Sequence, residues 1–213
     1  MKKIIYILSI VIVGCSPSST DQEIISEKTT ETLIDTITTD SVNNLKRTAK
    51  TTDFNTFYDN FVTVITNKDT ANFNSFIHKD YGLHFIEAPG AMPMFVKIYA
   101  IENFKAINTQ QSFFNLAFDG IEKTPLNDSL PQVICDDNIY SKQGCFVQET
   151  NPLNKSQIWN YSDLTDKQKQ EIEVIANTIT HTVVNTSNYT FYFSLIDNNW
   201  LVTFIDIRTP CSA

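Results

Sequence analysis

Asp206 and Arg208 form the polar pair of this chain best suited to binding chemistry, because they stand two residues apart near the C-terminus. Alternate residues of a β-strand point to the same side, so an extended segment places both on the face that carries Trp200 and Phe204. A carboxylate and a guanidinium beside two aromatic rings could orient a small ligand in a pocket. The alternative is an ion pair at a sheet edge, which contributes at most about 1 kcal/mol when exposed.

Histidines near carboxylates are the candidates for a metal site or a general base. His78 and His84 lie close to Asp80 and Glu87 in the sequence, but in a strand His84 and Glu87 would point to opposite faces. This spacing disfavours a shared metal ion, and we expect neither a metal nor a cofactor. We place His181 on the polar side of a helix, facing solvent.

Signatures of common enzymes are missing from the sequence. The five glycines are isolated, whereas phosphate- and dinucleotide-binding loops need several close together so that backbone amides approach the phosphates. There is no G-x-S-x-G, H-E-x-x-H or S-x-x-K motif, which removes the commonest hydrolase signatures. Three aromatic residues in polar, loop-like segments are expected to pack within the fold rather than form a docking surface: Tyr140, Trp159 and Tyr161.

Three cysteines follow Cys15: Cys135, Cys145 and Cys211. Cys135 and Cys145 bracket a short, turn-prone loop, so we favour a disulfide between them, with Cys211 left over. Pairing of Cys145 with Cys211 is the alternative. No C-x-x-C pair exists, which argues against a metal site built on thiolates.

Helical periodicity appears at both ends of the folded part. Asp53 is a suitable N-cap for an aromatic-rich helix, and a second short helix is expected around residues 73–77. Thr165 and Gln168 form a capping box for a helix predicted over residues 166–185, with one apolar stripe.

Strands are predicted between and after these helices. The clearest is a C-terminal hairpin of residues 189–196 and 200–207, which is apolar on both faces and should therefore be central to the sheet. Residues 102–118 fit a helix imperfectly and stay open. The other expected strands cover residues 81–87, 93–101, 131–135 and 144–149.

Early helices followed by antiparallel strands predict one α+β domain over residues 53–213, with helices packed on one face of a curved antiparallel sheet. This order resembles the NTF2-like or cystatin-like class of cone-shaped domains in small Bacteroidota lipoproteins. The chain departs from that class in placing one long helix late rather than at the start.

The first residues have the pattern of an export signal. Lys2 and Lys3 precede an apolar segment, residues 4–13, that is too short to cross a hydrocarbon core needing about 20 residues. Ile12 to Cys15 resemble the lipobox of bacterial lipoproteins, which signal peptidase II cleaves. The resemblance implies removal of residues 1–14, a diacylglyceryl group on Cys15, and fatty acylation, such as palmitate, of the new amino terminus.

Residues 15–52 are polar and predict a lipidated, flexible tether. Because Ser16 is not aspartate, the analogy with lipoprotein sorting implies an outer-membrane location facing the periplasm, within the cell envelope. Removing Lys2 and Lys3 changes the formal charge from −8 to −10, which disfavours nucleic acid as a partner.

From the anchor, the tether and the missing signatures, we expect non-catalytic binding of an envelope protein or a small ligand. One alternative is a structural, assembly or inhibitor subunit of an envelope complex. Another is a hydrolase with a dispersed site of carboxylates and histidine.

Overall fold

The computed structural model describes residues 52–118 and 121–211 of the 213-residue chain. The predictions for the leader of residues 1–14, the lipid site at Cys15 and the tether as far as residue 51 lie outside these residues. Within the described ranges no helix has the length and apolarity needed to cross a bilayer.

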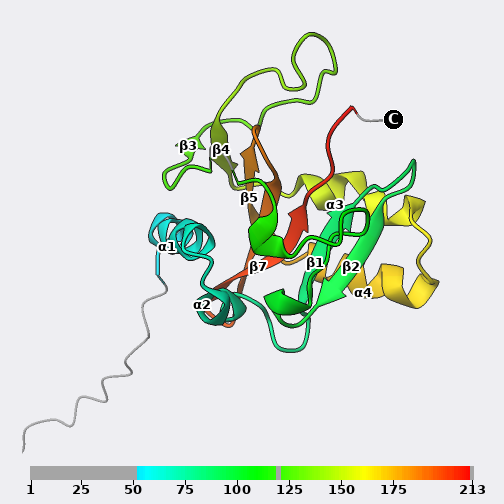
Figure 1. The fold of residues 1–213 in the computed structure, drawn as a ribbon, viewed down its shortest axis with the longest axis horizontal. Helices are drawn as coiled ribbons and strands as arrows, with labels where there is room; N and C mark the ends of the chain where they lie inside the picture. The colour runs from blue at the N-terminus through cyan, green and yellow to red at the C-terminus, as the bar shows by residue number, and fades with distance from the viewer. Residues whose placement is uncertain (1–51, 119–120, 212–213) are drawn as a thin grey trace, which may run out of the picture. The chain divides into compact units, whose positions relative to one another are not determined.

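The described part is an α+β fold built on one seven-stranded mixed sheet (Figure 1). The strand order is β2-β1-β7-β6-β5-β4-β3. The helices are α1 (Phe54–Thr66), α2 (Thr70–Asn74), α3 (Pro152–Ser156) and α4 (Asp166–Ala176). The strands are β1 (Leu83–Glu87), β2 (Met94–Ile98), β3 (Leu126–Asn127), β4 (Cys145–Gln148), β5 (Ile179–Asn185), β6 (Thr190–Ile196) and β7 (Asn199–Asp206).

The hairpin of β6 and β7 lies inside the sheet, as predicted. Asp197 and Asn198 connect the two strands with positive φ angles of 50° and 62°, which is the backbone that a tight two-residue hairpin turn requires. The sheet is not purely antiparallel, because β1 pairs with β7 and β3 pairs with β4 in parallel.

Helices cover both faces of the sheet, which corrects the prediction that they pack on one face (Figure 1). We call the packing under α1 and α2 the first core; its fully buried rings include Phe61, Phe73, Phe85, Phe191 and Phe193. We call the packing under α3 and α4 the second core; it contains Ile86, Trp159, Ile172, Ile175, Tyr192 and Phe204.

The first helix is capped as the sequence predicts. The Asp53 carboxylate accepts a hydrogen bond from the backbone N–H of Thr56 at 3.1 Å. The bond from the Thr56 hydroxyl, followed by this backbone bond, lowers the pKa of Asp53. The second helix, α2, is shorter than expected and ends before Phe76 and Ile77, which nevertheless join the first core.

The helix predicted over residues 166–185 is wrong in its second half. The capping box of Thr165 and Gln168 is present, but α4 ends at Ala176 and β5 begins at Ile179. The segment after Ala176 is rich in β-branched residues, which favour a strand. An apolar spacing of four residues fits both a helix and a strand, so the stripe alone could not separate them.

A β-bulge in β7 changes which side chains share a face. Tyr192 pairs with Phe204 and Phe193 pairs with Val202, so Thr203 is an extra residue without a cross-strand partner. An extra residue reverses the alternation of side chains along a strand. Trp200 consequently packs at the first core, whereas Phe204 lies in the second core.

The strand predicted at residues 131–135 is absent from the described fold. Residues 128–144 instead form a projecting loop between β3 and β4, which we call the arm (Figure 1). Within the arm, Val133 and Tyr140 form only an isolated β-bridge. The ambiguous region after β2 contains two single 3₁₀ turns, Ile101–Asn103 and Phe113–Asn115.

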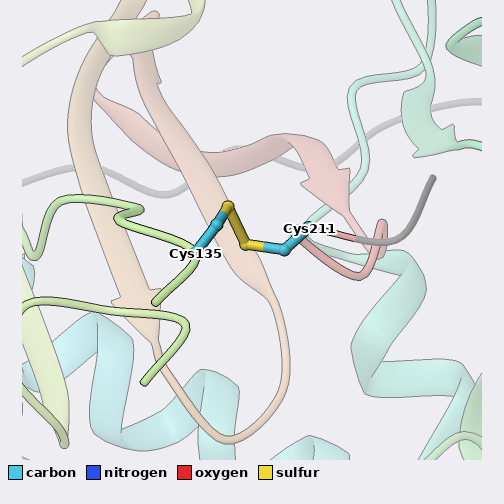
Figure 2. The surroundings of a disulfide bond; sticks show 2 residues. All are labelled: Cys135 and Cys211. Atoms are coloured by element: carbon cyan, nitrogen blue, oxygen red, sulfur yellow. A yellow bond between two sulfur atoms is a disulfide. The ribbon is translucent and has the colours of Figure 1, made fainter. Parts of the chain in front are cut away.

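The disulfide joins Cys135 of the arm to Cys211 of the C-terminal tail (Figure 2). Neither the favoured pair, Cys135 with Cys145, nor the alternative, Cys145 with Cys211, is formed. Cys145 is a free, buried thiol in β4, with its sulfur 3.7 Å from the hydroxyl of Tyr58. Proximity in the sequence was misleading here, because β4 carries Cys145 into the first core while the arm turns toward the tail.

Candidate functional site

A groove of about 640 Å³ lies where β1 and β7 end. The segment after β1, the start of β6, the arm and the C-terminal tail form its walls. The Cys135–Cys211 disulfide ties the arm to the tail at this groove (Figure 2). The volume falls within the range of pockets that hold small organic ligands.

Asp206 and Arg208 line this groove as a rigid ion pair. The Arg208 Nε donates to Oδ1 of Asp206 at 2.8 Å, and a terminal guanidinium nitrogen donates to Oδ2 at 2.6 Å. The backbone N–H of Arg208 also donates to Oδ1 at 3.1 Å. The Arg208 side chain is 27% exposed and that of Asp206 11%, so the pair is shielded but accessible from the groove. Bidentate geometry of this kind fixes the guanidinium plane.

Two buried tyrosines, Tyr140 from the arm and Tyr192 from β6, line the same groove. Burial raises the pKa of both phenols, the nearby Asp206 carboxylate raises it further, and Arg208 acts in the opposite direction. Both hydroxyls therefore stay protonated at neutral pH. Neither hydroxyl makes a hydrogen bond to a described residue, and neither hydroxyl oxygen is fully enclosed by protein atoms. Both hydroxyls are therefore accessible from the groove.

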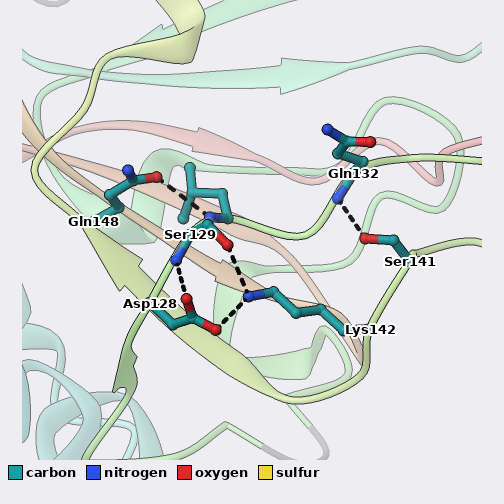
Figure 3. A network of polar contacts seen from close by, with 7 residues as sticks. Asp128, Ser129, Gln132, Ser141, Lys142 and Gln148 are labelled. Carbon is teal, nitrogen blue, oxygen red and sulfur yellow. Dashed lines mark hydrogen bonds and ion pairs between the residues drawn. The ribbon is translucent and has the colours of Figure 1, made fainter.

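Polar contacts at the base of the arm hold the arm in place (Figure 3). The Lys142 ammonium donates to Asp128 at 2.7 Å and to the hydroxyl of Ser129 at 3.2 Å. The carbonyl oxygen of the Gln148 side chain accepts from the backbone N–H of Leu130 at 3.3 Å. Farther out, the Ser141 hydroxyl accepts from the backbone N–H of Gln132 at 3.0 Å. These contacts position the wall that includes Leu130 and Tyr140.

The groove is amphipathic and carries no net charge. Asp206 and Arg208 are its only ionised lining residues within the described chain. The aliphatic walls come from Ala88, Ala91, Leu130, Pro131, Val133, Pro152, Val184 and Pro210.

The structure divides the four ligand residues that the sequence analysis placed together. Asp206 and Arg208 line the groove, whereas Phe204 is fully buried in the second core. Trp200 lies at a second groove of about 660 Å³ beside the β6–β7 turn. The bulge at Thr203 causes this separation, because it turns Trp200 to the other face.

Two ring side chains at the second groove, Trp200 and His78, have hydrogen-bond partners. The Trp200 indole donates to the carbonyl of Thr52 at 2.8 Å. Nδ1 of His78 accepts from the backbone N–H groups of Asp80 and Tyr81, each at 3.1 Å.

The remaining histidines do not form a common site. His84 is buried and stacks on Phe204, and burial lowers its pKa to about 3, so the ring is neutral at neutral pH. Glu87 lies on the opposite face, as predicted; burial raises its pKa, which the bond from the Ile107 N–H partly counters. Among the described residues no group of three or more histidines, cysteines or carboxylates is arranged to hold a metal ion.

His181 lies on β5 rather than on a helix and is shielded rather than facing solvent. Its ring stacks on Phe54 at 4.2 Å between centroids and meets Trp200 edge-on at 4.9 Å. Burial lowers its pKa, and the Glu149 carboxylate, 3.5 Å from Nε2, opposes that effect. His181 lines neither of the two grooves.

The sequence analysis did not place the two buried tyrosines, Tyr140 and Tyr192, at this site, and only Tyr192 could have been found from the sequence. In the hairpin register Thr190 pairs with Asp206, so Tyr192 is a diagonal neighbour of Asp206. Tyr140 joins the site through the arm, which no periodicity predicts. Of the other loop aromatics, Trp159 is buried, as expected, whereas the expectation was wrong for Tyr161, which is 72% exposed.

In comparisons with known proteins, no protein-family model, no curated protein and no solved structure matches the chain.

Proposed function

We propose that this protein is a lipid-anchored envelope protein whose folded domain binds a small polar ligand in the groove at Asp206 and Arg208. The observation that carries the proposal is the set of uncommitted polar groups around this ion pair. Three N–H bonds of Arg208 and the hydroxyls of Tyr140 and Tyr192 have no hydrogen-bond partner among the described residues.

The same groups suit binding better than proton transfer. A general base must hold a free lone pair at a pKa near the working pH. Asp206 is already bonded twice to the Arg208 guanidinium, and both phenols have raised pKa values that keep them protonated. The Arg208 guanidinium and the two phenol hydroxyls act as fixed donors, which is the role of orienting groups in a binding pocket.

The proposed anchor is the lipid on Cys15. Two or three acyl chains hold a protein at a bilayer much more firmly than one, because each buried methylene contributes about 0.8 kcal/mol. A flexible tether of the length of residues 15–52 would have an r.m.s. span of roughly 30–35 Å. The domain would therefore reach ligands away from the membrane surface while remaining attached to it.

We also keep the cone-shaped, NTF2-like or cystatin-like class as a proposal for the fold. Extra residues at Thr180 in β5 and Thr203 in β7 support it, because bulges bend a sheet. The parallel pairs and the helices on both faces are departures from that class.

A second candidate is an assembly subunit that docks on a partner protein. Three apolar side chains of the arm are 40–51% exposed: Val133, Ile134 and Ile139. Exposed apolar groups on a projecting loop are typical of protein contacts. Ile134 and Ile139 do not line the groove, whereas Val133 does, so a docked partner would lie along the arm and reach the rim of the groove.

The experiment is to purify the native lipoprotein from its own membranes in a detergent without a sugar headgroup. Mass spectrometry of the intact protein and of released small molecules then reports the lipid and the ligand together. We expect a mass that corresponds to acylated Cys15 and a small molecule that is lost from Arg208→Met. Lys79→Met, at the second groove, is the matched control and should retain it.

An unmodified Cys15 or a retained leader would overturn the anchor. A protein that carries no small molecule, or one that Arg208→Met retains, would overturn the binding site. A stoichiometric partner protein without a small molecule would favour the assembly role.

A further inference from the structure

Resting on the proposed function, we propose that the ligand of the Asp206–Arg208 groove is a neutral saccharide. The inference depends on three properties of the groove: its charge balance, its inventory of hydrogen-bond groups and its apolar walls.

The charge balance disfavours an ionic ligand. Asp206 and Arg208 neutralise each other within the groove, and no further ionised side chain of the described residues lines it. An anion would meet a guanidinium whose charge is already compensated by a carboxylate at 2.6 Å. A cation would meet that carboxylate behind the guanidinium. Burying an unpaired charge is costly, so a neutral ligand fits this site better.

The hydrogen-bond inventory matches a ligand with several hydroxyl groups. Arg208 has five N–H donors and uses two of its side-chain donors on Asp206, which leaves three for a ligand. The hydroxyls of Tyr140 and Tyr192 can each donate and accept. Asp206 accepts three bonds from Arg208 and keeps about one of roughly four lone-pair positions. Hydroxyls donate and accept, so neighbouring hydroxyls on one ring can satisfy all of these groups.

The walls match the other side of a sugar. A pyranose ring presents C–H groups on its faces and hydroxyls at its rim. The groove places the Tyr140 and Tyr192 rings and aliphatic side chains such as Leu130 and Val184 around its polar cluster. A ligand that is apolar on its faces and polar at its rim can place its faces against the apolar walls and its hydroxyls against the polar cluster. No buried polar group is then left without a hydrogen-bond partner.

Rigidity supports recognition of a specific shape. The disulfide between Cys135 and Cys211 and the contacts of Lys142 fix the arm and the tail. The bidentate bond fixes the Arg208 plane. Preorganised groups lose little conformational freedom when a ligand binds, which helps a neutral ligand that gains no strong ionic attraction.

The test uses the full lipoprotein, again in a detergent without a sugar headgroup, because such a headgroup would compete. Calorimetric titrations would use four neutral tetrasaccharides and two charged oligosaccharides. The neutral probes are maltotetraose, cellotetraose, laminaritetraose and fully N-acetylated chitotetraose; the charged ones are tetragalacturonate and a sulfated maltotetraose. We expect at least one neutral probe to bind and both charged probes to bind more weakly.

Variants localise the binding. Arg208→Met should weaken the neutral probe roughly tenfold or more, because charge-assisted hydrogen bonds are lost. Tyr192→Phe keeps the ring and removes only the hydroxyl, so it should weaken binding by roughly five- to tenfold even if Arg208→Met does not fold. Lys79→Met should leave the affinity unchanged.

The outcomes separate this inference from the proposed function. Binding of a charged probe but no neutral one, with loss in Tyr192→Phe, would overturn the inference of a neutral ligand and support the groove as a binding site. No binding of any probe, while the native protein carries another small molecule that depends on Arg208, would do the same. No binding together with an empty native protein would overturn both.

Discussion

Arg208 binds both carboxylate oxygens of Asp206 from a position only two residues further along the chain. The two side chains therefore lie on the same side of the segment that leaves β7, and the pair forms without help from any other element. Its orientation depends on the bulge at Thr203, which sets the face that Asp206 occupies.

Removing the Arg208 side chain should destabilise the domain. In Arg208→Met the shielded Asp206 carboxylate loses its cation, and we expect a loss of about 1–3 kcal/mol in the free energy of unfolding. Urea titration measures this loss. The double variant Asp206→Asn with Arg208→Met should recover part of the stability, because no unpaired charge remains. Equal stability of the double and the single variant would contradict this account.

The disulfide should contribute more to stability than any single surface contact. It closes a loop with a sequence separation of 76 residues, and cross-links of this kind typically stabilise by about 2–4 kcal/mol. Cys135→Ser with Cys211→Ser should lower the unfolding free energy by this amount, measured by urea titration under non-reducing conditions.

Peptide mapping of the unreduced protein checks the pairing itself. A linked peptide that contains Cys135 and Cys211 is expected, and Cys145 should react with a thiol reagent only after unfolding, because it is buried. Cys145→Ala is the matched control and should retain the linked peptide. A linked peptide that contains Cys145 would refute the assignment.

Stability should fall in mild acid because of His84. Burial is the main cause of its lowered pKa, followed by the positive charge of Lys97, and the hydrogen bond to the Thr203 backbone only partly opposes them. Between about pH 6.5 and pH 3 the unfolded chain binds a proton at His84 that the folded chain does not bind. Stability is therefore unaffected by this group above pH 6.5 and decreases as the pH falls through that window.

Comparison with His84→Leu isolates this contribution. The free energies of unfolding of the two proteins should differ by a constant from pH 7 to pH 9. Below pH 6.5 the wild type should lose stability relative to the variant, by about 3 kcal/mol at pH 4. Parallel curves over the whole range would show that His84 is protonated equally in both states.

Gly82 should tolerate no side chain. Its φ is +70°, and a Cβ atom there would lie 2.6 Å from the backbone oxygen of Ile98 on the neighbouring strand β2. Gly82→Ala should therefore cost about 2 kcal/mol or more. Gly90→Ala is the matched control, since a Cβ atom at Gly90 meets nothing within 4 Å. Thermal unfolding of both variants decides the matter, and similar melting temperatures would count against the close approach.

Local signals in the sequence were reliable where one residue type has one structural role. Asp53 as an N-cap, the capping box of Thr165 and Gln168, and the turn at Asp197 are all present. Each depends on a hydrogen bond or a backbone angle within a few residues, so the sequence contains the information directly.

Predictions that relied on the periodic spacing of apolar residues failed where a helix gives way to a strand and where a strand contains a bulge. Apolar residues four apart around Ile179 suit a helix and a strand equally, which hid the start of β5. The bulge at Thr203 separated Trp200 from Phe204, and no periodicity shows a bulge. The pairing of Cys135 with Cys211 depends on where the arm and the tail meet, which is a property of the whole fold.

The parallel pairing of β1 with β7 joins an early and a late segment of the described chain. β1 lies between β2 and β7, the last strand of the described residues, so one side of β1 has no strand partner until β7 is available. Contacts between such distant segments form slowly. Until β7 joins the sheet, part of the apolar surface of the phenylalanine-rich early region stays exposed, and such surface makes a folding intermediate prone to aggregation.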